Sequence, residues 1–119
     1  MLEKIYNFHE ALKQLSIMVN LLPDDKTVWI QRGLVYQEMG NHTLAINDFE
    51  MASELAAATI ASIKPDDKGD KDEKLLEENN RIASEALFYM AKSKLQAGQI
   101  ELSIQDFERS ELIRPTAAI

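Results

Sequence analysis

The chain has 119 residues, with 13 basic and 20 acidic side chains, so its net charge at pH 7 is -7. This length suits one domain, and a surface of this sign repels phosphate backbones, which argues against a nucleic-acid partner. The absence of cysteine excludes disulfide bonds, thiolate metal sites and cysteine nucleophiles. No apolar run approaches the roughly 20 residues that span a bilayer, and the amino terminus lacks the apolar segment of a secretory signal. We therefore expect no membrane insertion and an intracellular, cytoplasmic location.

The first predicted helix covers residues 6–22 and ends before Pro23, a residue that cannot continue a helix. Asp24 or Asp25 is expected to cap the next helix, because a carboxylate there accepts hydrogen bonds from the first backbone N–H groups of the helix. A second helix is therefore expected to begin within a few residues of the first.

A helical hairpin is predicted over residues 26–55, interrupted once at Gly40-Asn41. Large and small side chains alternate on one stripe of each helix at spacings of three and four residues, so that small residues let the helices approach and large ones fill the space between them. The stripe residues are Trp29, Gly33 and Tyr36 in the first helix and Ala45, Phe49 and Ala52 in the second.

These residues at this spacing resemble the tetratricopeptide repeat, a helical hairpin with a period of about 34 residues. Arg32 departs from the family pattern, which usually has leucine at that position. The resemblance covers about three quarters of the chain. It implies an all-α solenoid of helical hairpins, with a concave groove, lined by the first helix of each hairpin, that binds peptides or helices of other proteins.

Two spacings relate the other helices to this hairpin. Ala11, Leu15 and Met18 precede Ala45, Phe49 and Ala52 by one family period. A longer interval, the distance from Gly40 to Gly98, is called the hairpin spacing below. It also separates Ala45, Phe49 and Ala52 from Ser103, Phe107 and Ser110. At the same spacing, the positions of Trp29, Gly33 and Tyr36 are taken by Leu87, Ala91 and Lys94. We therefore expect about five helices in a single domain, 1–119. Its parts are a partial repeat at 1–23 (second helix only), a repeat at 24–57, an insertion at 58–83 and a repeat at 84–117.

The insertion is predicted to lengthen two helices into a protruding finger. The phrase Pro-Asp-Asp-Lys occurs at 23–26 and again at 65–68, which marks the second site as a break between helices. Helices are expected at 43–64 and 72–96, because neither range contains glycine or proline. Residues 66–71 would then form the tip of the finger.

The residues that catalysis or metal binding would need are scarce. His9 and His42 are the only histidines, and no glycine-rich phosphate loop is present. The chain is therefore not expected to be an enzyme or to hold a cofactor. One calcium-loop pattern, formed by Asp66, Asp70, Asp72 and Glu77, has Lys68 and Lys71 at places that need an oxygen ligand and glycine. We expect no metal there.

The resemblance places a partner-binding groove on the outward side chains of the first helices. These residues are Thr27, Ile30, Gln31, Leu34, Gln37 and Glu38, then Glu85, Phe88, Tyr89, Lys92, Leu95 and Gln96. For Ile30, Leu34 and Leu95, packing against a neighbouring helix is an equal alternative to contact with a partner. Phe88 is the preferred anchor, because Leu87 and Ala91 take the core stripe of its helix, and Phe107 is expected in the core together with Phe49.

The expected function is that of an interaction module or adaptor that holds a peptide or helix of another protein. The alternative is a structural subunit, or a piece of a longer array, whose open repeat ends contact other chains or other copies of itself. A minor alternative is a module that binds the carboxyl-terminal tails of chaperones. It is disfavoured because Gln31, Glu85 and Tyr89 stand where that subclass needs asparagine and basic residues.

Overall fold

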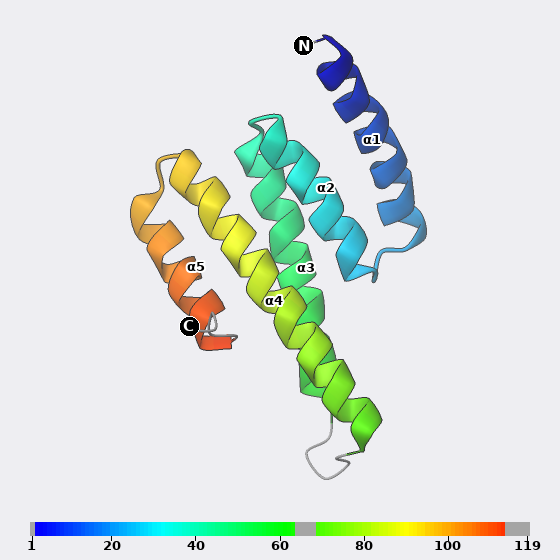
Figure 1. Cartoon of the computed structure of the whole chain (residues 1–119), viewed down its shortest axis with the longest axis vertical. Helices are drawn as coiled ribbons and strands as arrows, with labels where there is room; N and C mark the ends of the chain where they lie inside the picture. Colours follow the sequence, from blue (N-terminus) through cyan, green and yellow to red (C-terminus); the bar gives the residue numbers. More distant parts are fainter. Residues whose placement is uncertain (1, 64–68, 114–119) are drawn as a thin grey trace.

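The computed structural model describes residues 2–63 and 69–113. Within these ranges the chain forms five α-helices and no strand, which confirms the predicted all-α fold. The helices are α1 (Leu2–Leu21), α2 (Lys26–Glu38), α3 (His42–Ser62), α4 (Asp70–Gln96) and α5 (Ile100–Ile113). Each helix packs on the next in the chain, and the array runs from α1 at one end to α5 at the other (Figure 1). Each of these described helices is too short or too polar to cross a membrane.

The turns that close the two hairpins have the same geometry. Gly40 after α2 and Gly98 after α4 have φ angles of 81° and 87°, a region that only glycine occupies without strain. In both turns the N–H of the residue after the glycine donates to a carbonyl in the last turn of the helix, at 2.8 Å. This arrangement satisfies helix-end carbonyls and reverses the chain. The two turns are separated by the hairpin spacing found in the sequence.

Side chains cap the starts of α2 and α3. Asp25, one of the two predicted candidates, accepts a hydrogen bond from the Thr27 N–H at 3.1 Å. Asn41 likewise accepts one from the Leu44 N–H at 3.3 Å. Each cap satisfies a backbone donor that has no partner within its helix. The starts of α2 and α3 are therefore set by local hydrogen bonds as well as by packing.

The core lies between α2, α3 and α4 and is centred on Phe49, which is fully buried. Alanines on α3 leave room for the neighbouring helices to approach its backbone. The buried apolar residues of this core are Ile30, Ala45, Phe49, Ala52, Ala56, Ile82, Ala83, Ala86, Leu87 and Met90. Gly33 on α2 faces Phe49 directly, so the predicted pairing of a small and a large residue across the hairpin is present.

Several predicted details were wrong. Phe107 is only half-buried, because it lines an open cleft between α4 and α5. The first helix starts at Leu2 and not at residue 6. The two predicted long helices, by contrast, are present as α3 (His42–Ser62) and α4 (Asp70–Gln96), close to the expected bounds 43–64 and 72–96. Residues 70 and 71, assigned to the finger tip, are therefore helical, while 66–68 lie outside the described residues. The division into repeats and an insertion, and the rigidity of the finger, stay predictions.

The close contact at Gly33 predicts a large effect of adding one carbon. A Cβ atom there would lie 2.6 Å from Phe49 Cε1, and the ring is enclosed on all sides. We expect Gly33→Ala to lower the free energy of unfolding by about 1–3 kcal/mol, because α2 must shift away from α3. Urea unfolding followed by circular dichroism measures this.

Gly69→Ala is the matched control, because a Cβ at position 69 meets no atom within 4 Å. A loss at Gly33→Ala no larger than that of the control would show that the hairpin does not depend on this contact.

Candidate functional site

Helices α2 and α4 are joined directly by one polar side chain. Gln37 Nε2 donates hydrogen bonds to the Tyr89 carbonyl oxygen at 3.0 Å and to Ser93 Oγ at 2.7 Å. Ser93 is fully buried and Gln37 is half-buried, so these bonds lie at the junction of the two helices. The first helices of successive hairpins therefore share one surface whose spacing this link sets.

The structure distributes the twelve predicted groove residues over three degrees of burial. Seven of them are exposed: Thr27, Gln31, Glu38, Phe88, Lys92, Leu95 and Gln96. Four are half-buried, namely Leu34, Gln37, Glu85 and Tyr89, and Ile30 is buried. Ile30 belongs to the core, and Leu34 packs against it, which is the alternative that the sequence left open for both. Leu95, by contrast, is 48% exposed.

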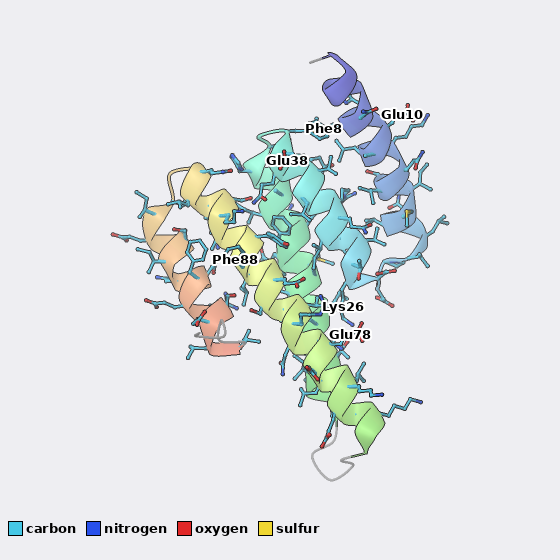
Figure 2. All side chains as sticks on the ribbon, viewed as in Figure 1. Phe8, Glu10, Lys26, Glu38, Glu78 and Phe88 are labelled. Atoms are coloured by element: carbon cyan, nitrogen blue, oxygen red, sulfur yellow. The ribbon has the colours of Figure 1, made fainter. Side chains whose placement is uncertain are left out.

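Phe88 is the centre of an aromatic cluster at the edge of α4. It is 45% exposed and projects on the side that faces α5 (Figure 2). Its ring meets those of Phe107 and Tyr89 edge to face, with centroids 5.5 Å and 6.1 Å away. Lys92 Nζ lies 5.7 Å from its centroid, within the range of a cation–π contact. Phe88 is thus held in place by neighbours while nearly half of it remains exposed.

A cleft of about 420 Å³ opens beside Phe88, between α4 and α5. Its lining combines three aromatic rings with two serines and two carboxylates: Ser84, Glu85, Phe88, Tyr89, Phe107, Ser110 and Glu111. The serines hold the two helices together, since Ser84 Oγ lies 3.0 Å from Ser110 Oγ and 3.1 Å from the Ser110 carbonyl oxygen. The aromatic part of the cleft remains available to a ligand or partner.

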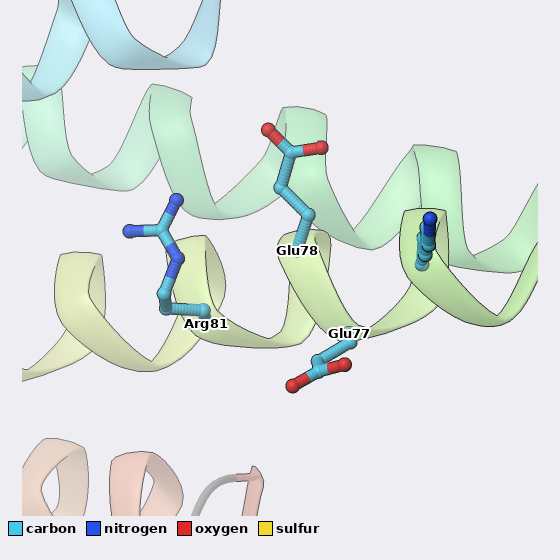
Figure 3. A pocket seen from close by; sticks show the side chains of 4 residues that line it. Glu77, Glu78 and Arg81 are labelled. Atoms are coloured by element: carbon cyan, nitrogen blue, oxygen red, sulfur yellow. The ribbon is translucent and has the colours of Figure 1, made fainter.

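A second hollow, of about 190 Å³, lies on the amino-terminal half of α4. It is lined by Lys74, Glu77, Glu78 and Arg81, all on one helix. Figure 3 shows Glu77 and Glu78 pointing to opposite sides of that helix. Charged groups of both signs that do not converge on a common point do not form a binding site.

Arg32, the departure from the family pattern, forms a buried ion pair that the sequence analysis missed. Its Nε and Nη2 atoms donate to the two carboxylate oxygens of Asp48, each at 2.8 Å. Its guanidinium lies 5.2 Å from the ring centroid of Trp29, and Nη1 reaches Ser16 Oγ on α1 at 3.4 Å. The hydrogen bond to Asp48 raises the pKa of Arg32 above its ordinary value, so the guanidinium stays charged. One side chain thus connects α1, α2 and α3.

The second hairpin contains a matching pair. Lys94 Nζ lies 2.6 Å from Asp106 Oδ2, and the Asp106 carboxylate is 4% exposed, as is that of Asp48. Asp48 and Asp106 are themselves separated by the hairpin spacing. That repetition was the signal from which these buried carboxylates were predictable. Lys94, which takes the stripe position of Tyr36 in the second hairpin, supplies the cation that pairs with Asp106.

The residues considered for chemistry are not assembled into a site in the described ranges. His9 is exposed on α1, and His42 is the first residue of α3. Asp72 and Glu77 of the calcium-loop pattern lie within α4, and that helix begins at Asp70. Asp66 lies outside the described residues. A helix does not fold into the loop around an ion that the pattern requires.

Comparison with known proteins bears on the central hairpin. Residues 27–59 match the family model of the tetratricopeptide repeat. The match begins at the second residue of α2 and ends near the carboxyl end of α3. No curated protein and no solved structure gave a significant match.

The Arg32–Asp48 pair predicts a specific pattern of stability. Arg32→Leu restores the family's usual residue but leaves a buried carboxylate without its partner. We expect it to lower the free energy of unfolding by about 3 kcal/mol. Adding Asp48→Ala to this variant should recover a large part of the loss, because the unpaired charge is removed. Chemical denaturation of the two variants measures both effects.

Arg81→Leu is the matched control, because Arg81 and Glu85 form an exposed pair with both side chains 43% accessible. Its effect should stay below about 1 kcal/mol. If Asp48→Ala deepened the loss caused by Arg32→Leu, the explanation by an unpaired buried charge would be wrong.

Proposed function

The chain is a tetratricopeptide-repeat protein, and from this premise we propose that it binds a peptide or helix of another protein on the face that α2 and α4 form. The observation that supports this proposal is the link from Gln37 to α4 at Tyr89 and Ser93. It fixes two rows of side chains at a constant separation. A rigid surface loses little conformational entropy when a partner binds.

The side chains of this face suit a partner with both polar and apolar groups. Gln31 and Glu38 on α2 and Lys92 and Gln96 on α4 are exposed and offer hydrogen-bond donors and acceptors of both charges. Leu95 adds an apolar contact. An extended peptide needs such polar groups for its backbone, and an amphipathic helix needs the apolar position.

The same reasoning leads us to propose no catalytic activity and no cofactor. The tetratricopeptide repeat is an interaction repeat without enzymatic activity, so a protein partner is the expected ligand. The acidic balance of the chain disfavours nucleic acid. The lack of cysteine suits an intracellular, cytoplasmic location, where thiols stay reduced. Capture of a chaperone tail is not favoured, because Glu85 would repel a terminal carboxylate.

A second candidate function is that of a subunit held in a larger assembly. It is favoured by apolar side chains that are left exposed on and just after α1, at the end of the array opposite α5. Ile17 is 50% exposed, Leu21 73% and Leu22 50%. Contact with other chains or other copies at this end would cover them. Under this hypothesis, the mass measured by light scattering should rise with protein concentration, whereas a constant monomer mass contradicts self-assembly.

Site-specific photo-crosslinking tests the proposed α2–α4 face. A benzophenone amino acid placed at position 31 on α2 or 95 on α4 should capture the same partner in cells. The control is position 50 on α3, where Glu50 is exposed away from these helices. With the purified partner, Leu95→Ala should weaken binding about tenfold, as loss of an interface anchor does.

Leu44→Ala on α3 is the matched control for Leu95→Ala, because Leu44 is also exposed, at 40%. Equal capture at all three positions, or equal affinity of the two leucine variants, would contradict binding at the α2–α4 face.

A further inference from the structure

Residues at the same place in the two hairpins differ sharply in burial. At the hairpin spacing, Ile30 corresponds to Phe88 and Phe49 to Phe107. Ile30 is 8% exposed and Phe49 is fully buried, whereas Phe88 is 45% exposed and Phe107 is half-buried. The local sequence does not explain this, because the second pair is the more aromatic. The difference lies in what covers each hairpin.

Helix α4 covers the first hairpin. It packs along α3 and reaches α2, and it contributes Ala83, Ala86 and Met90 to the core cluster that contains Ile30 and Phe49. Its alanines allow close approach, and the methionine fills the remaining space. In the described residues, no helix takes the same position on α4 and α5. The 420 Å³ cleft beside Phe88 and Phe107 lies at that position.

The first hairpin therefore indicates what kind of element fits the cleft. On the first hairpin, the surface that corresponds to the cleft is covered by one α-helix, α4, with a narrow face of small and medium apolar side chains. Phe88 and Phe107 form a comparable apolar surface, and Ser110 replaces Ala52 at a nearly equal size. A helix lying along this surface fits both the shape and the chemistry of the cleft.

Charge distinguishes between the possible sources of that helix. Glu85 and Glu111 line the cleft, and its lining contains neither lysine nor arginine among the described residues. Arg81 pairs with Glu85, and Lys92 covers one side of Phe88, so these cations lie around the cleft and not in its lining. The whole chain carries a net charge of -7, so a second copy would bring further negative charge to a lining that already contains Glu85 and Glu111. A basic helix of another protein is attracted.

We propose that the cleft between α4 and α5 binds one amphipathic α-helix of another protein. The apolar face of that helix lies on Phe88 and Phe107, and its flanking lysine or arginine residues face Glu85 and Glu111. This inference goes beyond the proposed function, because the cleft lies on the α5 side of α4. It stands even if the α2–α4 face binds nothing.

A peptide taken from the chain itself tests the proposal. Residues 79–96 include the face that packs on the first hairpin, and they contain three basic residues and one acidic residue. The fluorescein-labelled peptide is titrated with the whole protein, and binding is followed by fluorescence anisotropy. We expect saturable binding by the unmodified protein and about tenfold weaker binding by Phe88→Ala. A peptide with Ala86→Glu, which places a charge on the packing face, should not bind.

Leu102→Ala is the matched protein control, since Leu102 lies on α5, is 46% exposed and does not line the cleft. Its affinity should stay within about twofold of the unmodified protein. Amide chemical shifts of the unmodified protein provide a readout that needs no variant, and the peptide should shift the signals of Phe88, Phe107 and Ser110. The proposal is overturned by absence of saturable binding, by equal binding to Phe88→Ala, or by shifts confined to Gln31 and Glu38.

Discussion

The contact between the Phe49 ring and the backbone of α2 at Gly33 is the constraint on which the other elements depend. A ring this large is fully buried only because position 33 has no side chain, and it then forms the centre on which α4 also packs. The alanines of α3 extend this close approach along the helix. The α2–α4 face exists because α3 holds both helices at a short distance.

Polar links add specificity to that packing. Arg32 with Asp48 and Lys94 with Asp106 place one buried carboxylate in each hairpin, paired with a cation from the preceding helix. Such pairs contribute little net stability when they are complete, yet they strongly penalise an arrangement that separates them. They therefore fix the rotation of each helix about its axis. That rotation decides which side chains of α2 and α4 reach the surface.

The sequence predicted the helices well because local chemistry determines where they start and stop. The glycine turns, a helix cap at Asp24 or Asp25 and the alternation of small and large side chains are all visible in the sequence. Burial at the edges was not predictable in this way. A periodic pattern shows which face of α5 is apolar but not whether another helix covers it, so Phe107 was wrongly placed in the core. Likewise, the sequence left open whether Ile30 lies in the groove or packs against a neighbouring helix, and α4 helps to bury it. Arg32 was noticed, but its partner Asp48 lies on another helix, beyond the reach of local patterns.

The way in which α1 is attached has a consequence for dynamics. Among the described helices it contacts only α2, whereas α3 and α4 each have neighbours on both sides. In a linear array of this kind, every helix is stabilised chiefly by those next to it. Local opening therefore costs least at α1 and most at the α3–α4 pair. Because all contacts connect helices near each other in the chain, few long loops must close before the core forms, and folding is expected to start at the centre and spread outward.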